Sequence, residues 1–250
     1  MSGHNKWSSI KRKKGVADTK RGAIFTKIGR ELTMAARSGG GDPDGNVSLR
    51  LTIAKARAAN MPKENIERSI KRGTGELEGP PMEDMTYEAY GPHGSAIMVQ
   101  ALTDNRNRTV AELRATLARH NGRMGETGSV AWMFDHKGVI EVRAEGRDPD
   151  ELALELIDLG AEDVKVDQQI IEVYTAPSDM SKIQQLLNEK KIPYESAEVQ
   201  WIAKNPIDMP AADAASTMRL IETLEEIDDV QNVYSNVDIT DELLAQLEAA

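Results

Sequence analysis

The sequence predicts a multidomain α+β protein with an N-terminal three-helix bundle, a middle α+β domain and a ferredoxin-like βαββαβ domain inserted in the middle domain. Three observations predict this fold class. Apolar residues recur at helical spacing in the first 75 residues, a βαββαβ order of strands and helices starts afresh near residue 138, and one helix and one strand remain after it.

The first expected domain, residues 1–75, contains three amphipathic helices. Each has apolar residues at helical spacing, which predicts one buried face. Pro62 suits a first helical position, and Gly73 suits a helix terminus. Three short helices of this kind predict a small bundle. In order, they are expected over residues 22–38, 48–59 and 62–72.

The middle domain is expected to begin after a linker at residues 75–85, which is rich in Gly, Pro and acidic residues and lacks periodicity. The strands expected next are 86–90, 95–102 and 129–134. Between the second and third strands, Thr109 is followed three residues later by Glu112, as in a capping box, which predicts that a helix begins at Thr109.

A second group of strands and helices follows Gly138 in the order βαββαβ, which is the order of a ferredoxin-like unit with antiparallel strands and two helices. Asp148 and Pro149 form a credible helix start. The expected strands are 139–143, 163–166, 170–174 and 194–201, and the expected helices are 149–159 and 179–189.

A helix near 211–226 and a strand near 230–235 remain at the end of the chain. Alone they cannot close a core, but they can complete the sheet left unfinished at residue 134. We therefore expect a discontinuous middle domain with the ferredoxin-like unit inside it. The predicted boundaries are 1–75 for the basic helical domain, 82–134 plus 206–240 for the middle domain, and 135–205 for the inserted domain.

The charge of the chain is divided unevenly along its length. The first 75 residues contain 17 Lys or Arg against 6 Asp or Glu, while the remaining 175 contain 14 against 35. The overall net charge of −10 hides this division. A basic domain joined to an acidic body predicts that a polyanion binds the first domain, and nucleic acid is the first candidate.

The densest basic segment, residues 6–15, contains five cations and the indole of Trp7. Lys and Arg can neutralise phosphates, and an exposed indole can stack on a base or ribose. The alternative is a solvated, disordered tail that maintains solubility. Trp7 and Ile10 count against that alternative, because a tail selected only for solvation does not need them.

A second basic cluster lies at residues 104–109, where two Arg and two Asn precede an expected helix N-terminus. This segment is either a second nucleic-acid contact or a hydrogen-bonded turn that locks the middle domain. The candidate nucleic-acid-binding residues are His4, Lys6, Trp7, Lys11, Arg12, Lys13, Lys14, Lys20, Arg21, Lys27, Arg30, Arg106 and Arg108.

No enzymatic activity, metal or cofactor is expected. The sequence lacks the GxSxG, HExxH, GxxxxGK[ST] and GxGxxG motifs, and its four histidines are scattered. The absence of cysteine excludes disulfides, thiol nucleophiles and Cys-based zinc sites. No apolar run approaches the roughly 20 residues that cross a bilayer, and no signal-peptide core follows the basic N-terminus, so a soluble cytoplasmic protein is expected.

Several segments resemble the YebC-type family, which includes the mitochondrial translational activator of cytochrome c oxidase. In chain order they are GHNKWSSIKRKKGVADTKRGAIFTKIGREL, GGGDPDGNVSLRLTIAKARAANMPKENIERSIKRG, YEAYGPHGSAI, LTDNRNRTVAELR and GSVAWMF. The resemblance implies the same three-domain arrangement and no enzymatic activity. It also implies a function in gene expression, since members have been called DNA-binding transcriptional regulators or have been assigned to translation at the ribosome.

Two non-enzymatic functions therefore stay open. The first is a transcriptional regulator that binds DNA through the basic N-terminal domain. The second is a ribosome-associated translation factor that binds ribosomal RNA through a flexible basic arm. The basic residues show no grouping of Asn, Gln and Arg on one helix face that would suit direct readout of bases, which favours sequence-independent binding. An enzyme with a site between the acidic domains is a remote alternative.

Overall fold

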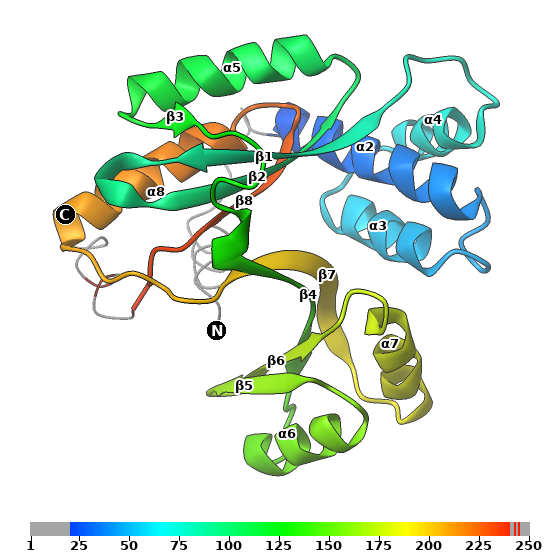
Figure 1. The fold of residues 1–250 in the computed structure, drawn as a ribbon. Helices are drawn as coiled ribbons and strands as arrows, with labels where there is room; N and C mark the ends of the chain where they lie inside the picture. The colour runs from blue at the N-terminus through cyan, green and yellow to red at the C-terminus, as the bar shows by residue number, and fades with distance from the viewer. Residues whose placement is uncertain (1–20, 241–242, 244, 246–250) are drawn as a thin grey trace.

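The computed structural model describes residues 21–240, 243 and 245. Three helices form a bundle at one end, and two separate four-stranded antiparallel sheets form the rest of the described chain, each with two helices packed on it (Figure 1). This is the multidomain α+β fold class that the sequence predicts.

The bundle consists of α2 (Arg21–Gly39), α3 (Val47–Ala58) and α4 (Lys63–Thr74). Its core contains the apolar stripes of all three helices, including Leu32, Leu49 and Ile66. Asn46 caps α3: its side-chain oxygen accepts the N–H of Leu49, while its amide nitrogen donates to carbonyls at the end of α2.

Gly73 does not end the third helix, contrary to the sequence prediction. Gly75 ends α4 in the left-handed conformation, with φ of 80°. Gly73 lies inside α4 and packs closely against α2, where an added Cβ would stand 2.6 Å from the Cβ of Ala36. The close packing of α4 on α2 therefore requires glycine, which has no side chain, at position 73.

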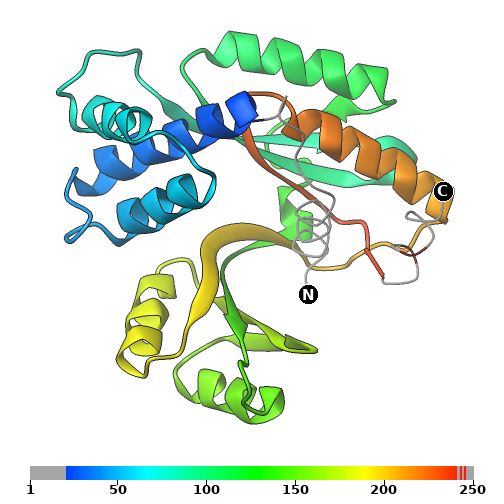
Figure 2. The same cartoon turned by 180° about the vertical axis from the view of Figure 1, so that it is seen from behind.

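The first sheet has the strand order β3 (Arg123–Met124), β1 (Glu83–Tyr90), β2 (Ala96–Thr103) and β8 (Val230–Ser235). Helices α5 (Arg106–Arg119) and α8 (Ala211–Glu225) pack on the sheet and on each other, as the view from behind shows (Figure 2). Residues of both helices and of the sheet share one apolar core. As expected, the last strand completes the sheet that the chain begins near residue 83.

The second sheet has the order β5 (Asp163–Asp167), β6 (Ile170–Thr175), β4 (Phe134–Arg143) and β7 (Tyr194–Ala203). Helices α6 (Pro149–Asp158) and α7 (Met180–Glu189) contribute to its core. The chain order β4-α6-β5-β6-α7-β7 is the βαββαβ order of the ferredoxin-like unit. These elements lie between β3 and β8 of the first sheet in the sequence, while the residue boundaries of the domains stay a prediction.

Two local predictions in the middle of the chain are wrong. The strand expected over 129–134 is instead a short 3-10 helix, η3 (Ala131–Met133), because the carboxylate of Glu88 on β1 accepts the backbone N–H groups of Val130 and Ala131 at 2.7 and 2.8 Å. Helix α5 begins three residues before Thr109, and Asn105 caps it by accepting the N–H of Arg108.

Candidate nucleic-acid interface

Many of the candidate residues lie outside the part of the chain that the structure describes. Arg21 is the first residue of α2, and the candidates at higher numbers have described side chains. The candidates that lie outside the described residues are His4, Lys6, Trp7, Lys11, Arg12, Lys13, Lys14 and Lys20.

Arg30 and Arg108 meet at one buried carboxylate, that of Asp229, in the turn between α8 and β8. Arg30 lies 2.7 Å from Asp229, whose side chain is 2% exposed, and Arg108 donates to both of its oxygens at 2.9 Å. Thr103 and Thr109 donate their hydroxyls to the same carboxylate. We call these five residues the Asp229 cluster. It joins the bundle to the first sheet and its helix α5.

Burial and hydrogen bonding shift the pKa of the Asp229 carboxyl in opposite directions. Burial alone would raise the pKa of its carboxyl, but the hydrogen bonds from Thr109 and Arg108 and the positive charge of Arg30 outweigh it, so the pKa is lowered. The carboxylate is therefore charged at neutral pH and holds both guanidinium groups. For the segment 104–109, this geometry corresponds to the hydrogen-bonded turn, one of the two alternatives left open by the sequence.

Lys27 also contacts the turn after α8, because its ammonium donates to the backbone carbonyl of Glu225. Arg106 is exposed in the first turn of α5. The structure thus brings Lys27, Arg30 and Arg108 together, and all three contribute to contacts within the fold. Their nucleic-acid contacts stay a prediction.

Six other cations of the bundle are exposed. Among the described residues, no carboxylate lies within 4.0 Å of any of their charged groups, whereas Lys55 pairs with Glu31 and Lys63 with Glu67. None of these six is among the candidate residues predicted from the sequence. They are Arg37, Arg50, Arg57, Arg68, Lys71 and Arg72.

One face of α4 carries Asn65, Arg68, Ser69 and Arg72 at positions i, i+3, i+4 and i+7, and we call these residues the α4 stripe. Contrary to the expectation from the sequence, Asn and Arg side chains are therefore grouped on one helix face, the kind of grouping that direct readout of bases uses. The signal was present in the sequence, because the apolar positions Ile66 and Ile70 place these four residues on another face of the helix.

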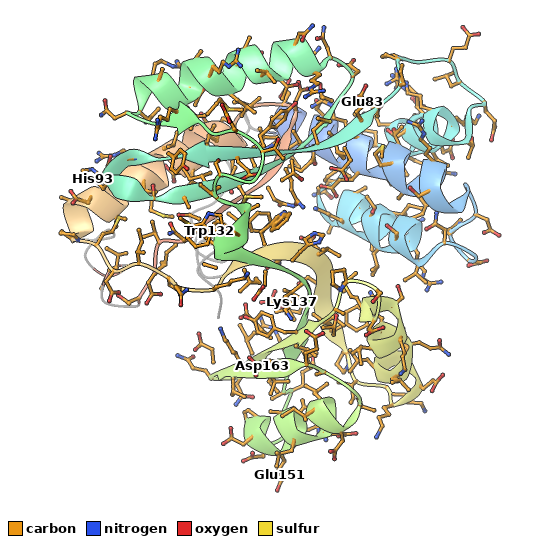
Figure 3. The ribbon with its side chains drawn as sticks, viewed as in Figure 1. Glu83, His93, Trp132, Lys137, Glu151 and Asp163 are labelled. Carbon is orange, nitrogen blue, oxygen red and sulfur yellow. The ribbon has the colours of Figure 1, made fainter. Side chains whose placement is uncertain are left out.

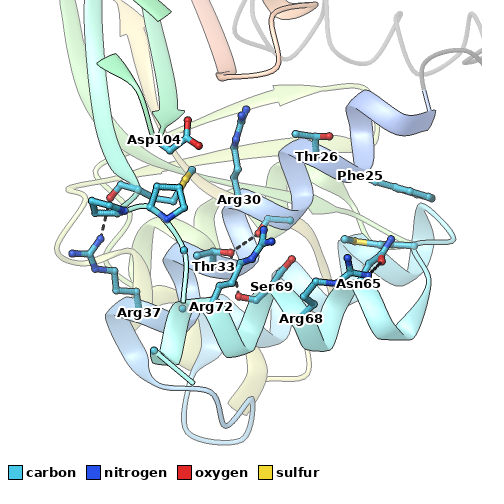
Figure 4. A pocket seen from close by; sticks show the side chains of 18 residues that line it. Phe25, Thr26, Arg30, Thr33, Arg37, Asn65, Arg68, Ser69, Arg72 and Asp104 are labelled. Carbon is cyan, nitrogen blue, oxygen red and sulfur yellow. Dashed lines mark hydrogen bonds between the residues drawn. The ribbon is translucent and has the colours of Figure 1, made fainter. Parts of the chain in front are cut away.

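The α4 stripe lines a cavity of about 630 Å³ together with residues of α2 and of the segment 75–82 (Figure 4). The lining includes four arginines, two from each helix, and one carboxylate, that of Asp104. Asp104 is already paired with Arg108 at 2.7 Å. The cavity is therefore positively charged.

In the described part of the chain, no group of three or more His, Asp or Glu side chains is arranged to hold a metal ion. Within the same residues, no helix combines the length and the apolar character needed to span a membrane. Trp132, labelled in Figure 3, lies in η3 just before β4, and its side chain is 64% exposed.

These observations define a class of protein: a multidomain α+β protein with an arginine-rich helical bundle at one end. Two family models match the chain, and they are described as the TACO1/YebC protein N-terminal domain, over residues 5–76, and the TACO1/YebC second and third domain, over residues 82–237. The chain belongs to the TACO1/YebC family, which confirms the resemblance found in the sequence.

Similar proteins match over nearly their whole length. A probable transcriptional regulatory protein of Desulfosudis oleivorans is 51% identical over 96% of this chain and 98% of its own. One of Geobacter sulfurreducens is 49% identical over 99% and 100%. Among solved structures, a conserved hypothetical protein of Aquifex aeolicus is 42% identical and has a TM-score of 0.80, covering 91% of this chain and 94% of that one.

Proposed function

We propose that this protein is a non-enzymatic regulator of gene expression that binds DNA in the cytoplasm through its basic N-terminal domain. The observation that carries the proposal is the group of exposed bundle cations without a carboxylate partner in the described structure. Cations that are not neutralised within the fold are free to neutralise phosphates. The names of the relatives, probable transcriptional regulatory proteins, support the same function.

Ribosomal RNA is the second candidate partner, with the ribosome as the site of action. One observation favours it: the arginines of the α4 stripe face a cavity, whereas reading of DNA in the major groove needs a convex helix surface. RNA is often recognised through single-stranded nucleotides that enter pockets. In both functions the described basic residues bind phosphates irrespective of sequence.

Crosslinking in cells separates the two partners. The tagged full-length protein is crosslinked with ultraviolet light, and the attached nucleic acid is sequenced. Discrete DNA peaks with RNA at background support the transcriptional regulator, while crosslinks concentrated on ribosomal RNA support the translation factor. Failure to recover either nucleic acid above an untagged control contradicts both.

The basic segment before α2 supplies the first mutational test. Replacing Lys11, Arg12, Lys13 and Lys14 with Ala removes four charges, so binding to DNA or RNA is expected to weaken for every sequence. The slope of log affinity against log salt concentration should fall by about 0.7–0.9 for each lost phosphate contact. Fluorescence anisotropy over a salt series measures both. An unchanged slope would remove this segment from the interface.

The remote alternative is an enzyme with a site between the acidic parts of the chain. A turnover screen on nucleotides and nucleic acids tests it. Activity that survives purification and disappears on replacement of a named carboxylate would overturn the non-enzymatic proposal.

A further inference from the structure

The cavity beside α4 has the size of a ligand site. Its volume of about 630 Å³ lies within the range of roughly 300–1,000 Å³ in which small-molecule sites occur. Most of its walls come from three segments, which are α2, α4 and the Gly- and Pro-containing segment 75–82, and Met61 and Asp104 line it as well. Arg37 donates to the carbonyl oxygen of Met82 at 3.0 Å and so ties that segment to α2.

Most guanidinium N–H donors of Arg68 and Arg72 in this cavity have no hydrogen-bond partner among the described residues. Arg30 is held by Asp229, but Arg68 bonds only to the side chain of Asn65, at 2.8 Å, among the described residues. For Arg72, the described structure shows no side-chain hydrogen bond or ion pair. Each guanidinium has five N–H donors in a planar fork that matches a phosphate group, so most of these donors remain available.

The position of the two arginines is determined by the helix. Arg68 and Arg72 are four residues apart on α4 and therefore lie one turn apart on the same face. The hydroxyl of Ser69 belongs to the same face. Two guanidinium groups and a hydroxyl on neighbouring turns form a cluster of donors with no carboxylate of α4 among the lining residues.

The cavity also has an apolar part. Phe25, Met61 and Pro80 line it, and Phe25 is half-buried against the bundle core. In Figure 4, Phe25 and Arg37 lie at opposite ends of the view, with Arg68 and Arg72 between them. A flat aromatic side chain that lines the same cavity as phosphate donors suits a base and its attached phosphate, because every base can stack on an aromatic face.

We propose that this cavity binds one nucleotide unit, with its phosphate on Arg68 and Arg72 and its base against Phe25. Where the nucleotide belongs to a nucleic-acid strand, this inference rests on the proposed function and deepens it. A free nucleotide offers the same chemistry, so the test includes both sources.

The test compares two full-length double variants that lose the same charge. Arg68→Gln with Arg72→Gln removes the phosphate donors of the cavity. Arg114→Gln on α5 with Arg219→Gln on α8 is the matched control, since both side chains are exposed, neither lines the cavity and neither belongs to the bundle. The probes are a 12-nucleotide single-stranded RNA, adenosine 5′-monophosphate and inorganic phosphate. Circular dichroism is used to check that both variants keep the melting temperature of the wild type.

We expect the cavity variant to bind the RNA at least about tenfold more weakly than the wild type, because a hydrogen bond to a charged group contributes at least that factor. The control should change affinity by less than about threefold. Loss of saturable binding of adenosine 5′-monophosphate in the cavity variant, with RNA binding unchanged, assigns the site to free nucleotides. Binding of inorganic phosphate alone assigns only the phosphate part of the site and overturns the base contact.

Equal binding of all three probes to the wild type and the cavity variant overturns the inference, and the proposed function survives if RNA still binds. Conversely, absence of RNA binding at every salt concentration, with nucleotide binding that requires Arg68 and Arg72, overturns the RNA form of the proposed function and leaves the inference standing. The two failures are therefore distinguishable.

Discussion

At the scale of single residues, the same residue type has different functions according to its neighbours. Arg30 and Arg68 both line the cavity. Arg30 is 17% exposed at its side chain and paired with a buried carboxylate, whereas Arg68 is exposed and bonded only to an amide in the described structure. The first guanidinium is therefore a structural group, and the second is available to a ligand.

Replacing Asp229 with Asn should destabilise the protein by about 2 kcal/mol. The change removes the charge that holds Arg30 and Arg108, and breaking a buried pair costs about 3–5 kcal/mol, reduced here because the Arg108 side chain is 42% exposed. Urea unfolding followed by circular dichroism measures the difference. Asp228→Asn, an exposed neighbour, is the control and should change stability by less than about 0.5 kcal/mol.

The contribution of Asp229 should also depend on pH. Because folding lowers the pKa of this carboxyl, its stabilisation is present above the unfolded value of about 3.9 and is lost as the pH falls through the folded value. The stability difference between the wild type and Asp229→Asn should therefore shrink below about pH 4. A difference that stays constant down to pH 2 would contradict the assignment.

At the scale of helices and strands, local signals predict most elements and long-range contacts decide the others. The periodicity of α6, α7 and α8 places their starts and ends within one residue of the structure. The segment 129–134 reads as a strand, but a carboxylate about forty residues earlier, Glu88, binds its N–H groups and produces η3. No pattern near residue 130 reports that contact.

In the candidate site, too, some features follow from local sequence and others depend on long-range contacts. The basic character of the bundle follows from composition, and the sequence therefore predicts the domain that carries the exposed cations. Which arginines remain unpaired depends on partners far along the chain, such as Asp229 for Arg30, 199 residues away in the sequence. The α4 stripe needed only helical spacing, so Arg68 and Arg72 could have been selected from the sequence.

Gly73→Ala should destabilise the bundle by about 1–3 kcal/mol. An alanine normally favours a helix over glycine by about 1 kcal/mol, but here its Cβ would lie 2.6 Å from Ala36 and closer still to the carbonyl oxygen of Thr33. Thermal unfolding measures the effect. Gly22→Ala in α2, where no atom of the described residues outside the helix's own backbone lies within 4 Å of the added Cβ, should leave stability unchanged or raise it. Equal effects of the two substitutions would contradict the close approach of α2 and α4.

At the scale of the whole molecule, nucleic-acid binding depends more on where the charges lie than on the net charge. A net charge of −10 would repel nucleic acid if all charges acted together. At physiological ionic strength the screening length is about 8 Å, so a bound strand experiences the nearby cations of the bundle and little of the distant acidic surface. Helix α6, at the far end of the ferredoxin-like unit from the bundle, carries several exposed carboxylates (Figures 1 and 3).

Neutralising these distant acids should therefore strengthen nucleic-acid binding only at low salt. In the variant Asp150→Asn, Glu151→Gln and Asp158→Asn, three exposed charges are removed without touching the bundle. At 0.01 M salt the screening length grows to about 30 Å, and we expect affinity to rise by roughly twofold. At 0.15 M the variant and the wild type should bind equally, and anisotropy titrations at both concentrations measure this. An equal gain at both concentrations would mean that α6 lies close to the bound nucleic acid, and the bundle alone would then not define the interface.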